Sequence, residues 1–122
     1  MIKRAHKYKA QRVNRVGFSF ASKLEGALFD YLKFLELAGD VTNIRVQPHV
    51  KLTKAQITMI PDFVVFNNKE QIDHWYEAKG YQTDVYRIKR RLWQHYGPGA
   101  LFVYGGSAKS LKLIEMIIPK GE

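Results

Sequence analysis

The sequence contains no cysteine among its 122 residues. This absence excludes a disulfide scaffold, a thiolate zinc site and a cysteine nucleophile. Long apolar runs are also missing: no segment approaches the roughly 18 to 20 residues that cross a bilayer, so we expect no membrane partner. No apolar signal core follows the first residues, and we therefore expect a cytoplasmic protein. The hydrophobic content of 46% is enough to build one packed core.

Acidic residues are missing from the first 24 positions, and the whole chain carries 20 Lys and Arg against 11 Asp and Glu. A net charge of +9 on a chain of this length usually indicates a polyanionic partner. We interpret residues 1–20 as a basic N-terminal arm and residues 21–122 as a single domain. A second basic cluster covers residues 87–91. The alternative interpretation of the arm is a solvated tail, and that of the second cluster is a solvated helix face. The residues that we expect to contact nucleic acid are Lys3, Arg4, Lys7, Lys9, Arg12, Arg15, Arg87, Lys89, Arg90 and Arg91.

Hydrophobic spacing predicts two helices. The first covers residues 22–38, with Ser22 as its N-cap and Gly39 as its stop signal. The second runs from residue 83 or 84 to about residue 96, and its apolar residues recur at helical spacing. The residues predicted to face inward from this second helix are Val85, Ile88, Leu92 and Tyr96.

Alternating or continuous apolar runs predict five strands, over residues 41–52, 57–66, 71–79, 100–104 and 112–118. A turn at residues 67–69 makes the second and third of these an antiparallel hairpin. Pro48 predicts either an edge strand or the end of a strand. The order α-β-β-β-α-β, followed by one more strand, predicts an α/β or α+β fold with a mixed central sheet flanked by helices.

The predicted hairpin brings two acidic residues together. Side chains at i and i+2 of a strand share a face, so Glu77 and Lys79 project together from the end of the third strand. The antiparallel second strand returns Asp62 to a position beside Glu77. Two adjacent carboxylates repel each other, and a divalent cation with hard oxygen ligands resolves that repulsion. The pattern therefore predicts a magnesium site with Asp62, Glu77 and the carbonyl of Ala78 as ligands.

This arrangement suits hydrolysis of a phosphodiester, because a metal held by two acids activates a bound water and polarises the phosphate. Lys79 can orient or deprotonate the attacking water, or stabilise the developing negative charge. A plain surface ion cluster, in which the acids neutralise Lys79, is the alternative. Glu25 also has two interpretations. Ser22-x-x-Glu25 is a capping box, and the first helical turn also places Glu25 where it can face the strand ends.

At Pro61-Asp62, Glu77-Ala78-Lys79 and Glu25 on the preceding helix, the sequence resembles the PD-(D/E)XK nuclease superfamily. It is similar to small phage and prophage endonucleases at Phe20 to Glu25, Gln47-Pro48, Pro61-Asp62-Phe63 and Glu77 to Gly80. The resemblance implies a restriction-endonuclease-like αβββαβ core. It also implies Mg²⁺-dependent DNA cleavage, for which we expect Mn²⁺ to substitute. Asp62 and Glu77 are then metal ligands, Lys79 lies at the water, and Glu25 is an accessory acid.

The resemblance also points to Holliday-junction resolving enzymes, which are small, basic and dimeric. We therefore expect a metal-dependent endodeoxyribonuclease without a small-molecule cofactor, acting as a homodimer on branched DNA in recombination. Its compartment is then the host cytoplasm if a phage encodes it. The alternatives are a sequence-specific or recombination-associated nuclease that needs a partner protein, a catalytically inactive nucleic-acid-binding module, and a small basic RNA-binding protein.

Overall fold

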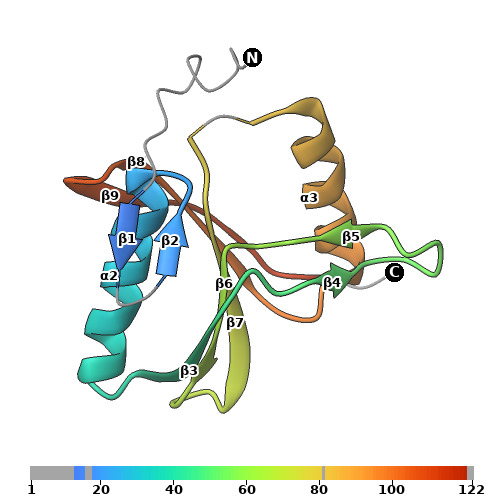
Figure 1. Cartoon of the computed structure of the whole chain (residues 1–122). Helices are drawn as coiled ribbons and strands as arrows, with labels where there is room; N and C mark the ends of the chain where they lie inside the picture. The colour runs from blue at the N-terminus through green and yellow to red at the C-terminus, as the bar shows by residue number, and fades with distance from the viewer. Residues whose placement is uncertain (1–12, 16–17, 81, 121–122) are drawn as a thin grey trace.

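The computed structural model describes residues 13–15, 18–80 and 82–120. A five-stranded sheet in the order β3-β6-β7-β8-β9 forms its centre, with β7 and β8 parallel and the other neighbours antiparallel. The two helices of the described residues, α2 and α3, lie on opposite sides of this sheet (Figure 1). The fold is therefore α+β with a mixed sheet, as the sequence pattern predicts. The elements are β1 (Val13–Arg15), β2 (Phe18–Phe20), α2 (Lys23–Leu37), β3 (Val41–Val46), β4 (Val50–Lys51), β5 (Thr58–Met59), β6 (Phe63–Asn67), β7 (Ile72–Ala78), α3 (Asp84–Tyr96), β8 (Leu101–Ser107) and β9 (Ser110–Ile117).

Helix α2 forms where the spacing predicts it. Leu28 and Leu32 are fully buried on its inner face, where they pack with Phe63 of β6. Phe20 joins the same cluster from β2, so the hairpin β1–β2 adds to the core on this side of the sheet. Gly39 follows the helix with a φ of +88°, a left-handed conformation that a glycine adopts without steric cost.

Helix α3 also forms where predicted, but its predicted inward face is wrong. The buried residues of α3 are Tyr86 and Trp93, which lie about 100° around the helix from the predicted stripe. Burying the Trp93 indole removes more apolar surface from water than burying a valine or isoleucine, and its Nε1 donates to the Gly99 carbonyl at 2.9 Å. Of the four residues predicted to face inward, Val85 is 61%, Ile88 60% and Tyr96 43% exposed, and Leu92 is partly buried.

Two of the predicted strands are interrupted. Residues 41–52 divide into β3 and β4, because Gln47 has a φ of 52°, which an extended strand does not accommodate. The Gln47 amide still donates to the carbonyl of Asp62 at 2.8 Å, so it fixes the residue that precedes β6. Residues 57–66 divide into β5 and β6. The pair β4–β5 forms a hairpin of its own that runs beside α3 (Figure 1).

The expected basic arm lies partly outside the described residues, since nothing is described before Val13. Within it, β1 and β2 pair antiparallel, which the sequence pattern did not indicate. β3 lies at one edge of the central sheet and ends at Val46, two residues before Pro48, which agrees with the strand end that Pro48 predicts. Neither helix of the described residues has the length and apolarity needed to cross a membrane.

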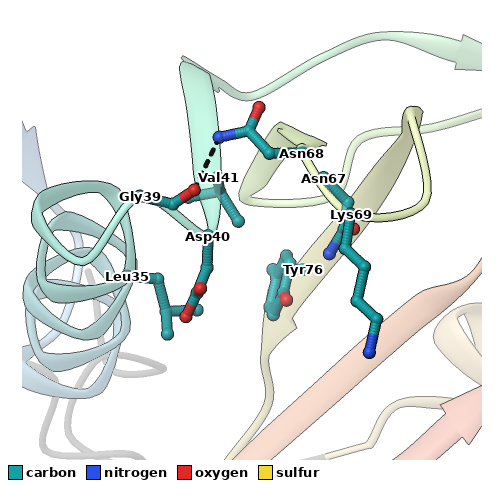
Figure 2. Close-up of a pocket in the computed structure, with 8 residues that line it drawn as sticks. All are labelled: Leu35, Gly39, Asp40, Val41, Asn67, Asn68, Lys69 and Tyr76. Carbon is teal, nitrogen blue, oxygen red and sulfur yellow. Dashed lines mark hydrogen bonds between the residues drawn. The ribbon is translucent and has the colours of Figure 1, made fainter.

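The turn between β6 and β7 is fastened to the end of α2 (Figure 2). The side-chain amide of Asn68 donates to the Gly39 carbonyl at 2.8 Å, and its backbone amide donates to the Asp40 carbonyl at 2.9 Å. An open hollow of about 550 Å³ lies at this turn, with Lys69 and Tyr76 in its lining. The hollow is at the opposite end of β6 from Asp62, so it is separate from the acidic residues that the sequence singles out.

Candidate functional site

Asp62 and Glu77 face each other at one end of the hairpin β6–β7. The register that pairs Phe63 with Tyr76 places Asp62 opposite Glu77 one residue further on. The Asp62 amide donates to Oε1 of Glu77 at 3.1 Å, and the Ala78 amide donates to Oδ2 of Asp62 at 2.7 Å. Each carboxylate is thus held by a backbone amide of the facing segment. The structure brings the two acids together in the way that the hairpin pattern predicts.

Lys79 extends the same site. Its Nζ lies 3.1 Å from Oε2 of Glu77, as expected for side chains two residues apart on one strand face. The Lys79 amide donates to the Tyr104 carbonyl at 2.8 Å, so strand β8 fixes the backbone at this point. Glu77 is only 6% exposed. This burial argues against a solvated surface ion cluster, because burying a charged carboxylate is costly without a specific role or partner.

Glu25 reaches the site from helix α2. Ser22 caps that helix, and its hydroxyl accepts a hydrogen bond from the Glu25 amide at 3.1 Å. The Ser22 half of the predicted capping box is therefore present. The Glu25 carboxyl lies close enough to Asp62 for its charge to raise the pKa of Asp62. The bond to the cap is made by the Glu25 backbone amide, whereas the Glu25 carboxyl lies near Asp62 at the strand ends.

The site concentrates negative charge in a region with little water. Burial is the main cause that raises the pKa of Asp62 well above its ordinary 3.8, and the charges of Glu77 and Glu25 raise it further. Burial also raises the pKa of Glu77 above its ordinary 4.5, although Lys79 opposes that rise. A positive charge placed between the acids would relieve this cost.

These carboxylates fit a magnesium ion. Asp62 and Glu77 offer hard oxygen donors at one point, and the mutual crowding of their charges is what a divalent cation neutralises. Throughout the part of the chain that the structure describes, no group of three or more His, Cys, Asp or Glu side chains is arranged to hold a metal. Mg²⁺ needs only one or two carboxylates because it retains several waters, whereas zinc needs three or four protein ligands.

Tyr86 is a site residue that the sequence reasoning missed. Its ring lies under the Lys79 ammonium group, with Nζ 4.4 Å from the ring centroid. Burial and the nearby charges of Glu77 and Asp62 raise the pKa of Tyr86 to about 12, while Arg90 lowers it. Among the described residues, its hydroxyl is the buried side-chain polar atom without a hydrogen-bond partner, which costs about 1–3 kcal/mol. Spacing alone does not single it out, because the stripe through Val85 and Ile88 on the same helix recurs more regularly.

The predicted nucleic-acid contacts have different surroundings. Arg90 forms a bidentate ion pair with Glu115 of β9, with Nε 2.9 Å from Oε1, so its charge is already matched. Arg87 pairs with Asp84 but its side chain is 60% exposed. Lys89 is half-buried and Arg91 is exposed. Arg15 belongs to β1. The other five residues of the arm, which lie outside the described residues, are Lys3, Arg4, Lys7, Lys9 and Arg12.

Comparison with known proteins identifies a family whose description names no function. No curated protein matches the chain. A protein family described as "Protein of unknown function (DUF1064)" matches residues 5–114. The matched segment contains the two helices, the facing acids and the lysine described above. Because the match extends over most of the chain, this protein belongs to the DUF1064 family.

Proposed function

We propose that the chain is a Mg²⁺-dependent DNA endonuclease that hydrolyses phosphodiester bonds. The observation that carries this proposal is the convergence of Asp62, Glu77, Lys79 and Glu25 at one end of the sheet. The topology supports it as well. In chain order, α2-β3-β6-β7-α3-β8 follows the αβββαβ core of the PD-(D/E)XK superfamily, to which we assign the fold.

Asp62, Glu77 and the carbonyl of Ala78 are the groups that would hold Mg²⁺. When bound there, the ion activates a water and neutralises charge on the phosphate. The protein supplies the rest of the chemistry. Backbone amides fix both carboxylates, so the acids do not have to reorganise during the reaction. Mn²⁺ has similar ligand preferences and is expected to substitute.

Lys79 is the group that acts on the attacking water or on the charge that develops on the phosphoryl oxygens. Its ammonium lies 3.1 Å from Glu77, within reach of anything held by that carboxylate. Glu25 acts as an accessory acid. Its charge raises the pKa of the neighbouring Asp62, so it adds to the negative charge that a bound cation would neutralise.

The substrate of this proposed nuclease is branched DNA, as in a Holliday-junction resolvase. The net charge of +9 supplies affinity for phosphates without sequence selection, and the described residues contain no separate recognition domain. A homodimer would place two such sites on two strands of a junction, as twofold symmetry requires. The exposed residues Arg87 and Arg91 on α3 are the described candidates for phosphate contacts.

The test is a cleavage panel with four-way junctions, flaps, forks and linear duplex of matched sequence, in Mg²⁺ and in Ca²⁺. We expect the wild-type chain to cut the junction in Mg²⁺. Asp62→Asn and Glu77→Gln should each lower the rate by about 100-fold to 1,000-fold or more, with junction binding retained. Asp40→Asn is the matched control, because Asp40 is an exposed acid at the opposite end of the sheet.

Each of the other outcomes of the cleavage panel contradicts part of the proposal. Junction binding without cutting of any substrate would support a catalytically inactive binding module. Cutting that appears only after a second protein is added would support a partner-dependent nuclease. If Asp62→Asn cut normally, the assignment of the site would be wrong even if the chain were a nuclease.

A further inference from the structure

We propose that Tyr86 is a positioning residue for Lys79, and that the face of its ring holds the ammonium group beside the carboxylates. This inference rests on the proposed nuclease function. The nitrogen lies 4.4 Å from the ring centroid, within the distance at which the negative face of an aromatic ring attracts a cation. Nothing in the motif around Glu77 and Lys79 indicates this contact, because Tyr86 belongs to a separate element, α3.

Lys79 needs such support because its side chain is long and flexible. Four rotatable bonds separate the ammonium from the backbone, and rotamer entropy favours release into solvent. Glu77 holds the ammonium on one side at 3.1 Å. That carboxylate is also the proposed metal ligand, so its oxygens have a competing use. The ring of Tyr86 has no competing ligand and keeps the position of Lys79 when Glu77 is engaged elsewhere.

The ring is itself well fixed. Tyr86 is 6% exposed and belongs to the cluster on the α3 side of the sheet, together with Trp93, Leu101 and Val103. The Tyr86 amide donates to the Thr83 hydroxyl at 3.0 Å, which anchors the first turn of the helix. A ring held by packing and by a helix cap can orient a flexible neighbour without losing freedom of its own.

The hydroxyl of Tyr86 separates two possible roles. It has no hydrogen-bond partner in the described structure, so the contact with Lys79 is made by the ring face alone. Tyr86→Phe keeps the ring and removes the hydroxyl, whereas Tyr86→Leu removes the ring and keeps an apolar side chain. The ring role therefore predicts that phenylalanine rescues function and leucine does not.

The experiment measures single-turnover cleavage of junction DNA in Mg²⁺, at saturating protein and at a temperature where circular dichroism shows every variant folded. Tyr86→Leu should lower the rate constant by about 3-fold to 30-fold, with the DNA dissociation constant unchanged. Tyr86→Phe should cut at the wild-type rate. Ile117→Ala truncates another buried residue of the same cluster and controls for lost packing, so it should also cut at the wild-type rate.

A second readout does not depend on activity. The ring should shift the NMR signals of the Lys79 ε-methylene protons upfield, in the wild type and in Tyr86→Phe but not in Tyr86→Leu. An unshifted signal in the wild type overturns the inference, as does a normal rate in Tyr86→Leu. Equal losses in both variants would assign the role to the hydroxyl and also overturn it. A wild-type chain that cuts no substrate in the cleavage panel contradicts the nuclease function instead.

Discussion

The carboxyl group of Asp62 is held where its negative charge is unfavourable. Burial and the charges of Glu77 and Glu25 all raise its pKa, and only the Ala78 amide acts in the opposite direction. Such an arrangement costs stability in a protein without bound metal, and selection for stability alone would remove it. Perturbed pKa values of this kind concentrate at functional sites, so the substitution of Asp62 tests this site directly.

Asp62→Asn should raise the melting temperature by several degrees at pH 7 in the absence of divalent metal. A carboxyl whose folded-state pKa is raised contributes stability below its unfolded pKa, near 3.8, and that contribution is lost as the pH rises through the folded pKa. Wild type should therefore lose stability relative to Asp62→Asn between about pH 4 and neutral pH. Asparagine can still accept the Ala78 amide. Thermal denaturation across this pH range measures the difference.

Added Mg²⁺ provides the matching comparison. A ligand that binds only the folded state stabilises it, so Mg²⁺ should raise the melting temperature of the wild type and not of Asp62→Asn. Asp40→Asn, at an exposed acid, leaves the site intact, so its melting temperature should match that of the wild type both without metal and with Mg²⁺. A wild type that grows more stable than Asp62→Asn as the pH rises without metal would show that the acid is favourably paired.

At the scale of elements, both helices deliver a site residue at the same helical position. Glu25 and Tyr86 are each the third residue after an N-cap, and the cap hydroxyl accepts the amide of that residue in both cases. Figure 1 shows that α2 and α3 begin at the end of the sheet where β7 finishes. The helix caps therefore stabilise the helices and also fix where the two side chains enter the site.

Ser22→Ala and Thr83→Ala should each destabilise the protein by about 1 kcal/mol, because each leaves a first-turn amide without its acceptor. Urea denaturation measures this loss through the transition midpoint. Ser22→Thr and Thr83→Ser keep a hydroxyl acceptor and serve as controls. If the alanine variants were as stable as the controls, the caps would contribute nothing to stability. They could then not fix the positions of Glu25 and Tyr86.

The sequence pattern predicted the parts of the fold that depend on local signals. Ser22, Gly39 and the turn at residues 67–69 mark element ends through short-range chemistry, and the structure places the ends of α2 and the β6–β7 hairpin there. The pairing of Asp62 with Glu77 follows from strand periodicity once the turn is known. These features need no knowledge of what packs against them.

The face of α3 could not be predicted from periodicity, because two stripes on that helix are apolar enough to be buried. The stripe through Val85 and Ile88 has the more regular spacing, yet the stripe through Tyr86 and Trp93 is buried. The choice depends on the hairpin β4–β5 and on strand β8, which supply the partners of Trp93. Tyr86 was missed for the same reason, since its role appears only when the helix is correctly oriented.

For the whole molecule, the two ends of the sheet have different properties. One end gathers Asp62, Glu77 and Lys79 with the starts of both helices. The opposite end is fastened by Asn68 to the α2–β3 turn (Figure 2). With helices on both faces and one end tied by hydrogen bonds, the proposed nuclease function requires DNA to approach the acids from the carboxylate end.

Removing residues 1–12 should weaken junction binding and reduce its dependence on salt. The deletion stops before β1 begins at Val13, so the hairpin that packs on α2 stays complete. Each lost phosphate contact lowers the slope of log K against log salt by about 0.9 for duplex DNA. The segment contains five Lys and Arg residues, so we expect the slope to fall by about 1 to 4.5. Binding titrations at several salt concentrations, with Ca²⁺ in place of Mg²⁺ to prevent cutting, measure this slope.

Lys69→Gln, at the turn far from the acids, is the control and should bind with an almost unchanged slope. If the truncated chain kept the wild-type slope, residues 1–12 would be a solvated tail, and the positive charges that contact DNA would have to lie within the described domain, on α3 or the β4–β5 hairpin.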